Sequence, residues 1–290
     1  LSVQGTSTGA IATAAQIAMS GARDTAAPGA AGFFGGTIDE VALYDTALAA
    51  PVGRWRLGEA VGAATAVDAS GYARTGTYTG GVTLAQTGIG SDTNTAALFD
   101  GTTGYVDMGT TTAFAFAGSF SIDAWFKTSS VSTLQMIVCR GDLNGSEGWN
   151  LHLASGQLLF TGVSAGVVKW TVIASGTYDD GVWHHVIAVY DSVAATATLY
   201  VAGVQVAQFA STGNASTPVT RLMIGGRDNG AGGVNSPFNG TIDEVSVYDV
   251  ALTVPNVDDV VAHYVASTWV SLASDLSAAT ALSVRRGMAG

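Results

Sequence analysis

Apolar and polar residues alternate with a period of two along most of this chain, as they do in β-strands with one buried face. The clearest case is residues 120–127, FSIDAWFK, where every second side chain is apolar. The same pattern predicts a strand at 183–190 and two more at 198–201 and 204–207, which the Ala-Gly dipeptide at 202–203 joins as a hairpin. Strands that recur with Gly, Asp and Asn turns between them predict an all-β sandwich or barrel.

A helical pattern appears only near the C-terminal end. Apolar residues recur at helical spacing over residues 257–265. A second helix is predicted over residues 275–286, followed by a glycine that ends it. We therefore expect a short helical tail over residues 256–290, whose first helix packs on the sandwich.

One long motif occurs twice. Residues 36–48, GTIDEVALYDTAL, recur 204 residues later as residues 240–252, GTIDEVSVYDVAL. A period this long indicates a duplicated domain, because solenoid repeats span only about 20–50 residues. We expect residues 1–51 to be the C-terminal part of one domain and residues 52–255 to be a complete second copy. The chain is then a piece of a longer protein.

Charge and cysteine content exclude several classes of function. The chain has a net charge of −11, and only 11% of its residues are charged. Its two lysines, Lys127 and Lys169, and its scattered arginines form no basic stripe of the kind that nucleic acids require. No run of about 18 apolar residues exists, so no membrane-spanning helix is predicted. Cys139 is the only cysteine, which excludes an intrachain disulfide, and its apolar neighbours predict a buried thiol.

Five motifs in a fixed order suggest a family. They are FDG at 99–101 with YV at 105–106, SFSIDAW at 119–125, GTYDDGVWHHV at 176–186, ATLYVAG at 197–203 and PFNGTIDEV at 237–245. Together they resemble the laminin-G-like, concanavalin A-like jelly-roll superfamily, in its bacterial and phage branch. The resemblance implies an all-β jelly-roll sandwich of two curved antiparallel sheets. One departure is Ala202, where the family usually has Asp before the hairpin glycine.

The motifs do not predict an enzyme. Members of the superfamily are mostly binding or spacer modules, although some relatives on the fold are glycosidases or lyases. Catalytic relatives place their two carboxyls in a Glu-x-Asp-x-x-Glu run, and none of the four glutamates here begins such a run. His184 and His185 are neighbours on a predicted strand, so their side chains should point to opposite faces and not act together.

The resemblance also implies one structural Ca²⁺ near the edge of the sandwich. Calcium takes six to eight oxygen ligands. By resemblance, Asp243 of the closing motif is the expected ligand, with Glu59, Gly101 and Asp68 as further oxygen donors, and Asp39 is the equivalent of Asp243 in the first copy. The alternative is that Asp243 caps turns and binds backbone amides.

Glycan binding requires exposed aromatic rings with polar groups beside them. The candidates are Trp149, His152, Trp170 and Trp125, of which Trp149 follows a polar loop that suits the rim of a site. The alternative for each tryptophan is packing within the sandwich. Residues 227–233, RDNGAGG, form either a recognition loop or a flexible connection.

We expect a non-enzymatic binding or structural module of a large extracellular or virion protein, namely a phage tail or capsid-surface component that contacts host glycans. One alternative is an accessory carbohydrate-binding domain of a secreted hydrolase or bacterial adhesin. Another is an architectural spacer without a ligand. The expected partners are glycans or neighbouring protein subunits of a larger assembly.

Overall fold

The computed structural model describes residues 23–24, 30–31, 49–89, 94–141, 145–218 and 220–253. The chain divides into two compact units, Leu1–Leu48 and Ala49–Gly290. The expected helical tail over residues 256–290 and Asp39 lie outside the described residues.

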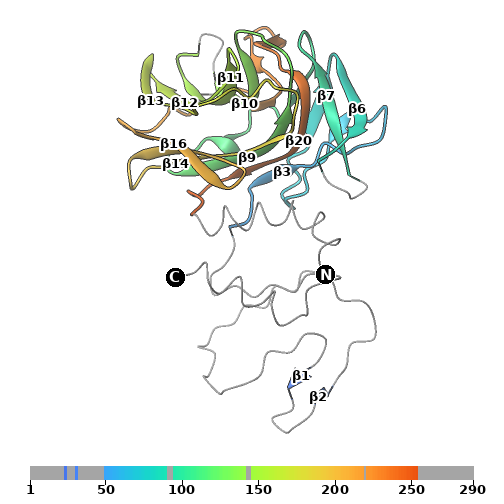
Figure 1. Cartoon of the computed structure of the whole chain (residues 1–290), viewed down its shortest axis with the longest axis horizontal. Helices are drawn as coiled ribbons and strands as arrows, with labels where there is room; N and C mark the ends of the chain where they lie inside the picture. Colours follow the sequence, from blue (N-terminus) through green and yellow to red (C-terminus); the bar gives the residue numbers. More distant parts are fainter. Residues whose placement is uncertain are drawn as a thin grey trace. The chain divides into compact units, whose positions relative to one another are not determined.

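The second unit consists mainly of two antiparallel sheets, which Figure 1 shows as separate layers. The sheet we call the β11 sheet has the strand order β13-β12-β11-β10-β17-β8-β5-β4. Its strands are β4 (Thr65–Ala66), β5 (Gly76–Thr79), β8 (Tyr105–Asp107), β10 (Gln135–Gly141), β11 (Gly148–Ala154), β12 (Gln157–Ser164), β13 (Val167–Ile173) and β17 (Met223–Ile224).

The other sheet, the β14 sheet, has the order β16-β15-β14-β9-β20-β7-β6, and β3 also pairs with β20. Its strands are β3 (Gly53–Trp55), β6 (Val82–Thr87), β7 (Thr95–Asp100), β9 (Phe120–Lys127), β14 (His184–Asp191), β15 (Thr196–Val201), β16 (Val204–Ala210) and β20 (Asn239–Tyr248). A 3₁₀ turn, η1 (Thr112–Phe114), and the small hairpin of β18 (Arg227–Asp228) and β19 (Val234–Asn235) complete the described elements. The predicted sandwich is thus confirmed.

The core lies between the two sheets and is rich in aromatic rings. Alternation along β9 places Phe120 in the core, where its ring centroid is 5.2 Å from that of Trp149 and 5.8 Å from that of Tyr190. Trp170 stacks on Tyr190 at 4.1 Å with an interplanar angle of 7°. Such pairs contribute about 0.5–1.5 kcal/mol beyond the burial of their area. The aromatic contacts therefore join strands of both sheets.

The hairpin between β15 and β16 has the two-residue link that the sequence predicted. Ala202 and Gly203 both have positive φ, at 49° and 80°. Two consecutive residues with positive φ make the turn type whose twist matches that of paired strands. Gly203 adopts this conformation without cost, whereas an alanine with positive φ is strained by about 1–2 kcal/mol. The departure at Ala202 therefore weakens the hairpin without changing it.

The small hairpin of β18 and β19 has a counterpart in the first unit, β1 (Arg23–Asp24) with β2 (Ala30–Ala31). The paired residues are Arg23 with Ala31 and Asp24 with Ala30 in one hairpin, and Arg227 with Asn235 and Asp228 with Val234 in the other. Each pair of the first hairpin recurs 204 residues later in the second, which is the period of the sequence repeat. The identical register supports duplication, and the division into domains at residue 51 stays a prediction.

Candidate functional site

A bulge in β20 brings two consecutive carboxylates to one partner. The register of β20 against β9 shifts between Asp243 and Ser246, and Glu244 within the bulge has a φ of 47°. Residues in a regular strand point to alternate faces, but the bulge removes that alternation here. The amide nitrogen Nδ2 of Asn94 consequently lies 3.3 Å from Asp243 Oδ1 and 3.1 Å from Glu244 Oε1.

The two carboxylates differ in how their charge is balanced. Glu244 pairs with Arg54 Nη2 at 3.0 Å and with Arg56 Nε at 2.7 Å. Asp243 is completely buried, and its Oδ2 accepts a hydrogen bond of 3.2 Å from the backbone N–H of Ile89. Burial, together with the charge of Glu244, raises the pKa of Asp243 to about 7. Asp243 therefore changes its charge close to neutral pH.

The other residues expected to bind calcium do not join Asp243. Both oxygens of Asp68 accept backbone N–H groups, from Arg54 and Ser70 at Oδ1 and from Arg74 at Oδ2. Asp68 therefore fixes the turn that follows β4.

Glu59 and Gly101 also have other surroundings. Glu59 accepts from the backbone N–H of Val67 and from the hydroxyl of Tyr78. Gly101 follows Asp100 of β7, which pairs with Asn239 of β20. Asn239 precedes Asp243 by four residues, which is about 13 Å along the strand at about 3.3 Å per residue. Within the described ranges no three Asp, Glu, His or Cys side chains converge on a possible metal position. The expected ligand set does not form, and calcium binding stays a prediction.

The structure corrects the expected exposure of two tryptophans. Trp149 and Trp170 are only 2% and 0% exposed, because both point into the core from their strands. Their indole rings are packed against other core rings and offer no face on which a sugar can stack. His152, on the opposite face of β11, is also buried, whereas Trp125 is half-buried with its ring 4.7 Å from that of His185.

The two adjacent histidines have separate surroundings, as the sequence predicted. His184 Nε2 lies 2.9 Å from Asp180 Oδ1. His185 Nε2 lies 2.7 Å from Asp123 Oδ1, and both residues of this pair are buried. Burial raises the pKa of Asp123, and the charge of His185 opposes that rise. The two imidazoles therefore take part in different interactions and do not act on one ligand.

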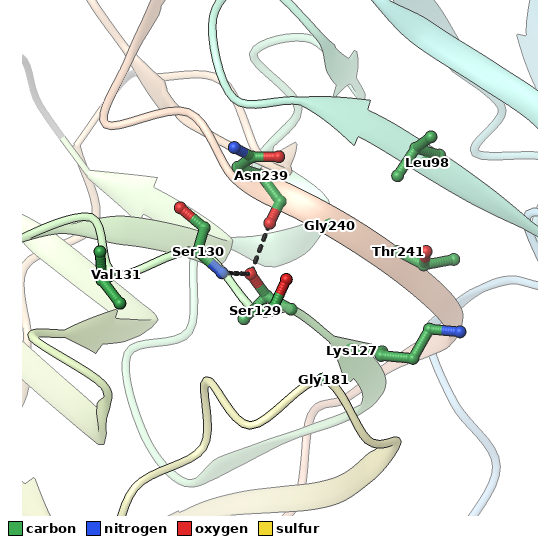
Figure 2. Close-up of a pocket in the computed structure, with 10 residues that line it drawn as sticks. Leu98, Lys127, Ser129, Ser130, Val131, Gly181, Asn239, Gly240 and Thr241 are labelled. Atoms are coloured by element: carbon green, nitrogen blue, oxygen red, sulfur yellow. Dashed lines mark hydrogen bonds between the residues drawn. The ribbon is translucent and has the colours of Figure 1, made fainter.

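An open groove of about 520 Å³ lies where β9 ends and β20 begins. Figure 2 shows Lys127, Ser129 and Asn239 around it, with Leu98 and Val131 at opposite sides of the view. Within the described residues, the side chains of Ser129 and Asn239 make no hydrogen bond. The Lys127 ammonium lies 5.0 Å from the centre of the Trp183 ring, which is half-buried. The groove thus combines exposed polar side chains with apolar side chains.

The walls of the groove are held in place by the backbone. Thr128 Oγ1 donates to the carbonyl of Asn239 at 2.5 Å and accepts from the N–H of Ser130 at 2.9 Å. Gly181 donates its N–H to the carbonyl of Thr128 at 2.8 Å. A Cβ on Gly240 would collide with the carbonyl oxygen of Lys127, so only glycine allows this close approach.

Sequence reasoning missed this groove, although two signals pointed to it. One is the hydroxyl-rich run TSSVST at residues 128–133, and the other is Asn239-Gly240-Thr241 in the closing motif. The two segments are more than 100 residues apart and meet only because Lys127 pairs with Thr241.

The fold of this chain is similar to that of solved toxin structures, among them two binding domains. The binding domain of Paraclostridial mosquitocidal protein 1 superposes with a TM-score of 0.57 at 15% identity, covering 74% of this chain and 52% of that one. The binding domain of botulinum neurotoxin serotype D gives 0.56 at 12% identity, over 74% and 52%. A structure of botulinum neurotoxin type C, which concerns its interaction with two ganglioside molecules, gives 0.56 at 15% identity, over 74% and 51%. This chain matches about half the length of these structures.

Two further comparisons concern the sequence. A search of curated proteins finds no match. Across the part of the chain that the structure describes, no helix is long and apolar enough to cross a membrane.

A family model with the description "Concanavalin A-like lectin/glucanases superfamily" matches residues 100–258, more than half of the chain. With both sheets and the five sequence motifs in agreement, the chain belongs to the laminin-G branch of the concanavalin A-like lectin/glucanases superfamily.

Proposed function

We propose that this chain is a non-enzymatic glycan-binding module of an extracellular protein, and that the groove between β9 and β20 holds the sugar. The observation that carries the proposal is a pair of exposed polar side chains, Ser129 and Asn239, which are open to a ligand on a groove whose walls the backbone fixes. The likeness in fold to a neurotoxin domain that interacts with gangliosides supports it.

The chemistry of the groove suits a sugar. Sugars present hydroxyl groups that need donors and acceptors, together with C–H faces that pack on apolar or aromatic side chains. Asn239 offers both a donor and an acceptor, and Ser129 a hydroxyl. Leu98 and Val131 are 36% and 82% exposed and supply apolar surface. The ring of Trp183 lies next to the groove through its contact with Lys127.

A glycan array with the full chain tests the proposal. We expect defined sugars to be retained, and Asn239→Ala to weaken their binding about fivefold, because one hydrogen bond to a ligand contributes about 1 kcal/mol. Gln205→Ala is the matched control, since it removes an exposed amide from β16, outside the groove.

Three outcomes contradict the proposal. If the array retains nothing, the architectural spacer is the better description. If Asn239→Ala and Ser129→Ala both bind as the wild type does, the sugar lies elsewhere. Hydrolysis of a retained glycan would refute the non-enzymatic role.

The larger context is a proposal of its own. We propose that the parent is a phage tail or capsid-surface component, with an accessory domain of a secreted hydrolase or an adhesin as the alternative. Electron microscopy of the native parent distinguishes a virion from a secreted enzyme.

A further inference from the structure

The register of the β14 sheet gathers the side chains of the groove on one face. Lys127 of β9 pairs with Thr241 of β20, and Thr241 pairs in turn with Leu98 of β7. Directly paired side chains stand about 5 Å apart, and every second residue of a strand faces the same side. Asn239 therefore faces the same side as Thr241. These four residues and Ser129 line one groove, so they are within reach of one ligand.

Lys127 brings a charge to this groove. Among the ten residues that line it, Lys127 is the only charged one (Figure 2). Within the described residues its ammonium forms no ion pair and no hydrogen bond, and its contact is with the ring of Trp183 at 5.0 Å. An ammonium has three N–H donors. These donors are open to a ligand in the groove.

The carboxylates next to the groove along the chain have other partners. Asp100, the last residue of β7, accepts three backbone N–H groups of the following turn at its Oδ1. Asp180, in the loop before β14, has its Oδ1 2.9 Å from Nε2 of His184. In the described part of the chain neither carboxylate pairs with Lys127. The positive charge of Lys127 is therefore not neutralised by these neighbours.

Trp183 supplies ring surface beside the ammonium. His184, the first residue of β14, pairs with Phe126, so the preceding Trp183 lies next to Lys127. Trp183 is half-buried, which leaves part of its ring accessible. Contacts between an ammonium and an aromatic ring are weak at exposed sites. The ammonium can therefore turn from the ring to an anion at little cost, since lysine has a flexible four-carbon stem.

We propose that the groove binds an acidic sugar with one negative charge, whose carboxylate or sulfate contacts the ammonium of Lys127. The hydroxyls of the sugar contact Asn239 and Ser129. One positive charge in the groove matches one negative charge on the ligand, because complementary charges select the partner. This inference rests on the proposed glycan-binding function and names the class of sugar.

The test compares sugars that differ only at C6. The full chain is titrated with methyl β-D-glucoside, its C6 carboxylate (methyl β-D-glucuronide) and its 6-sulfate, and with the same three galactosides. Binding is followed by saturation-transfer NMR near neutral pH. At least one anionic sugar should bind about fivefold more tightly than its neutral partner, because an exposed ion pair contributes up to about that factor. The affinities of carboxylate and sulfate distinguish the two anions.

Variants assign the preference to Lys127. Lys127→Gln should abolish the preference for the anionic sugar and leave the affinity for the neutral sugar unchanged. Lys127→Arg should keep most of the preference, because arginine keeps the positive charge. Lys169→Gln is the matched control: it removes the chain's other lysine, from β13 of the β11 sheet, and so changes the net charge equally outside the groove. Circular dichroism checks that each variant is folded.

A preference that disappears in Lys127→Gln and persists in Lys169→Gln supports the inference. If the preference persists in Lys127→Gln, or disappears in both variants, Lys127 does not hold the anion and the inference is wrong. If neutral and anionic sugars bind equally and both depend on Asn239, the acidic class is refuted and the proposed function stands. If none of the six sugars binds, the inference fails, and the glycan array decides the proposed function separately.

Discussion

Replacing Asp243 by asparagine should remove a pH dependence from the stability of the sandwich. The carboxyl is completely buried, and burial is the main cause that raises its pKa to about 7. In the unfolded chain the same carboxyl titrates near its ordinary value of 3.8. Between these pH values the unfolded state loses the proton while the folded state keeps it. The free energy of unfolding therefore falls as the pH rises through this window.

The size of the effect follows from the two pKa values. A difference of about three pH units corresponds to about 4 kcal/mol, at about 1.4 kcal/mol per unit. This stability is present below about pH 4 and is lost above about pH 7. It is large for a domain whose total stability is about 5–15 kcal/mol. Asp243→Asn keeps an acceptor for the N–H of Ile89 but cannot ionise, so this contribution disappears.

The assay is urea unfolding at about pH 5 and about pH 8 in excess EDTA. Between these conditions the wild type should lose about 3 kcal/mol more stability than Asp243→Asn does. Asp249→Asn removes an exposed carboxylate just beyond β20 and serves as the control. An equal pH dependence in the wild type and in Asp243→Asn would refute the reasoning from burial.

The same experiment tests calcium. Excess CaCl₂ should raise the urea midpoint of the wild type at about pH 8, where Asp243 is ionised, and leave Asp243→Asn unchanged. If EDTA and CaCl₂ give identical curves for the wild type, Asp243 holds no calcium.

Two further predictions concern packing and turn chemistry. Trp170→Ala should lower the free energy of unfolding by about 3–5 kcal/mol, whereas Val167→Ala, at a position 54% exposed on the same strand, should change it by less than about 0.5 kcal/mol. Similar urea midpoints for both variants would contradict the core position of Trp170. Ala202→Gly should raise stability by about 1 kcal/mol, because glycine adopts the positive φ of 49° without strain. A lower melting temperature for this variant would show that the turn is not strained.

The features that the sequence predicted correctly are local ones. Strand β9 covers residues 120–127 as predicted, because its alternation of apolar and polar residues is complete within eight positions. The hairpin at Ala202 and the separate surroundings of His184 and His185 follow from the same local rules.

The expected exposure of Trp149 was wrong because it was inferred from a neighbouring loop. The polar loop before Trp149 suggested a rim position, but the alternation Trp149-Leu151-Leu153 already marked the core face of β11. This alternation is a stronger indication of position than the polar loop, because burying each of these side chains stabilises the fold by about 1.5–3 kcal/mol.

The sites depend on register, which local patterns do not reveal. Asp243 belongs to β20, at the beginning of its bulge, whereas the pairing of Asp100 with Asn239 places Gly101 near the first residue of this strand. The resemblance supplied residue types for a calcium site, and the observed pairing separates one of them, Gly101, from Asp243.

The contact between Lys127 and Trp183 has an optical consequence. Trp149 and Trp170 are enclosed by core rings, so their fluorescence reports the packing of the two sheets. Trp183 is half-buried, and the Lys127 ammonium stands 5.0 Å from its ring. If a sugar in the groove draws Lys127 away from the indole, the loss of the nearby positive charge should shift the emission of Trp183. The fluorescence of Trp183 would then report occupancy of the groove without a label.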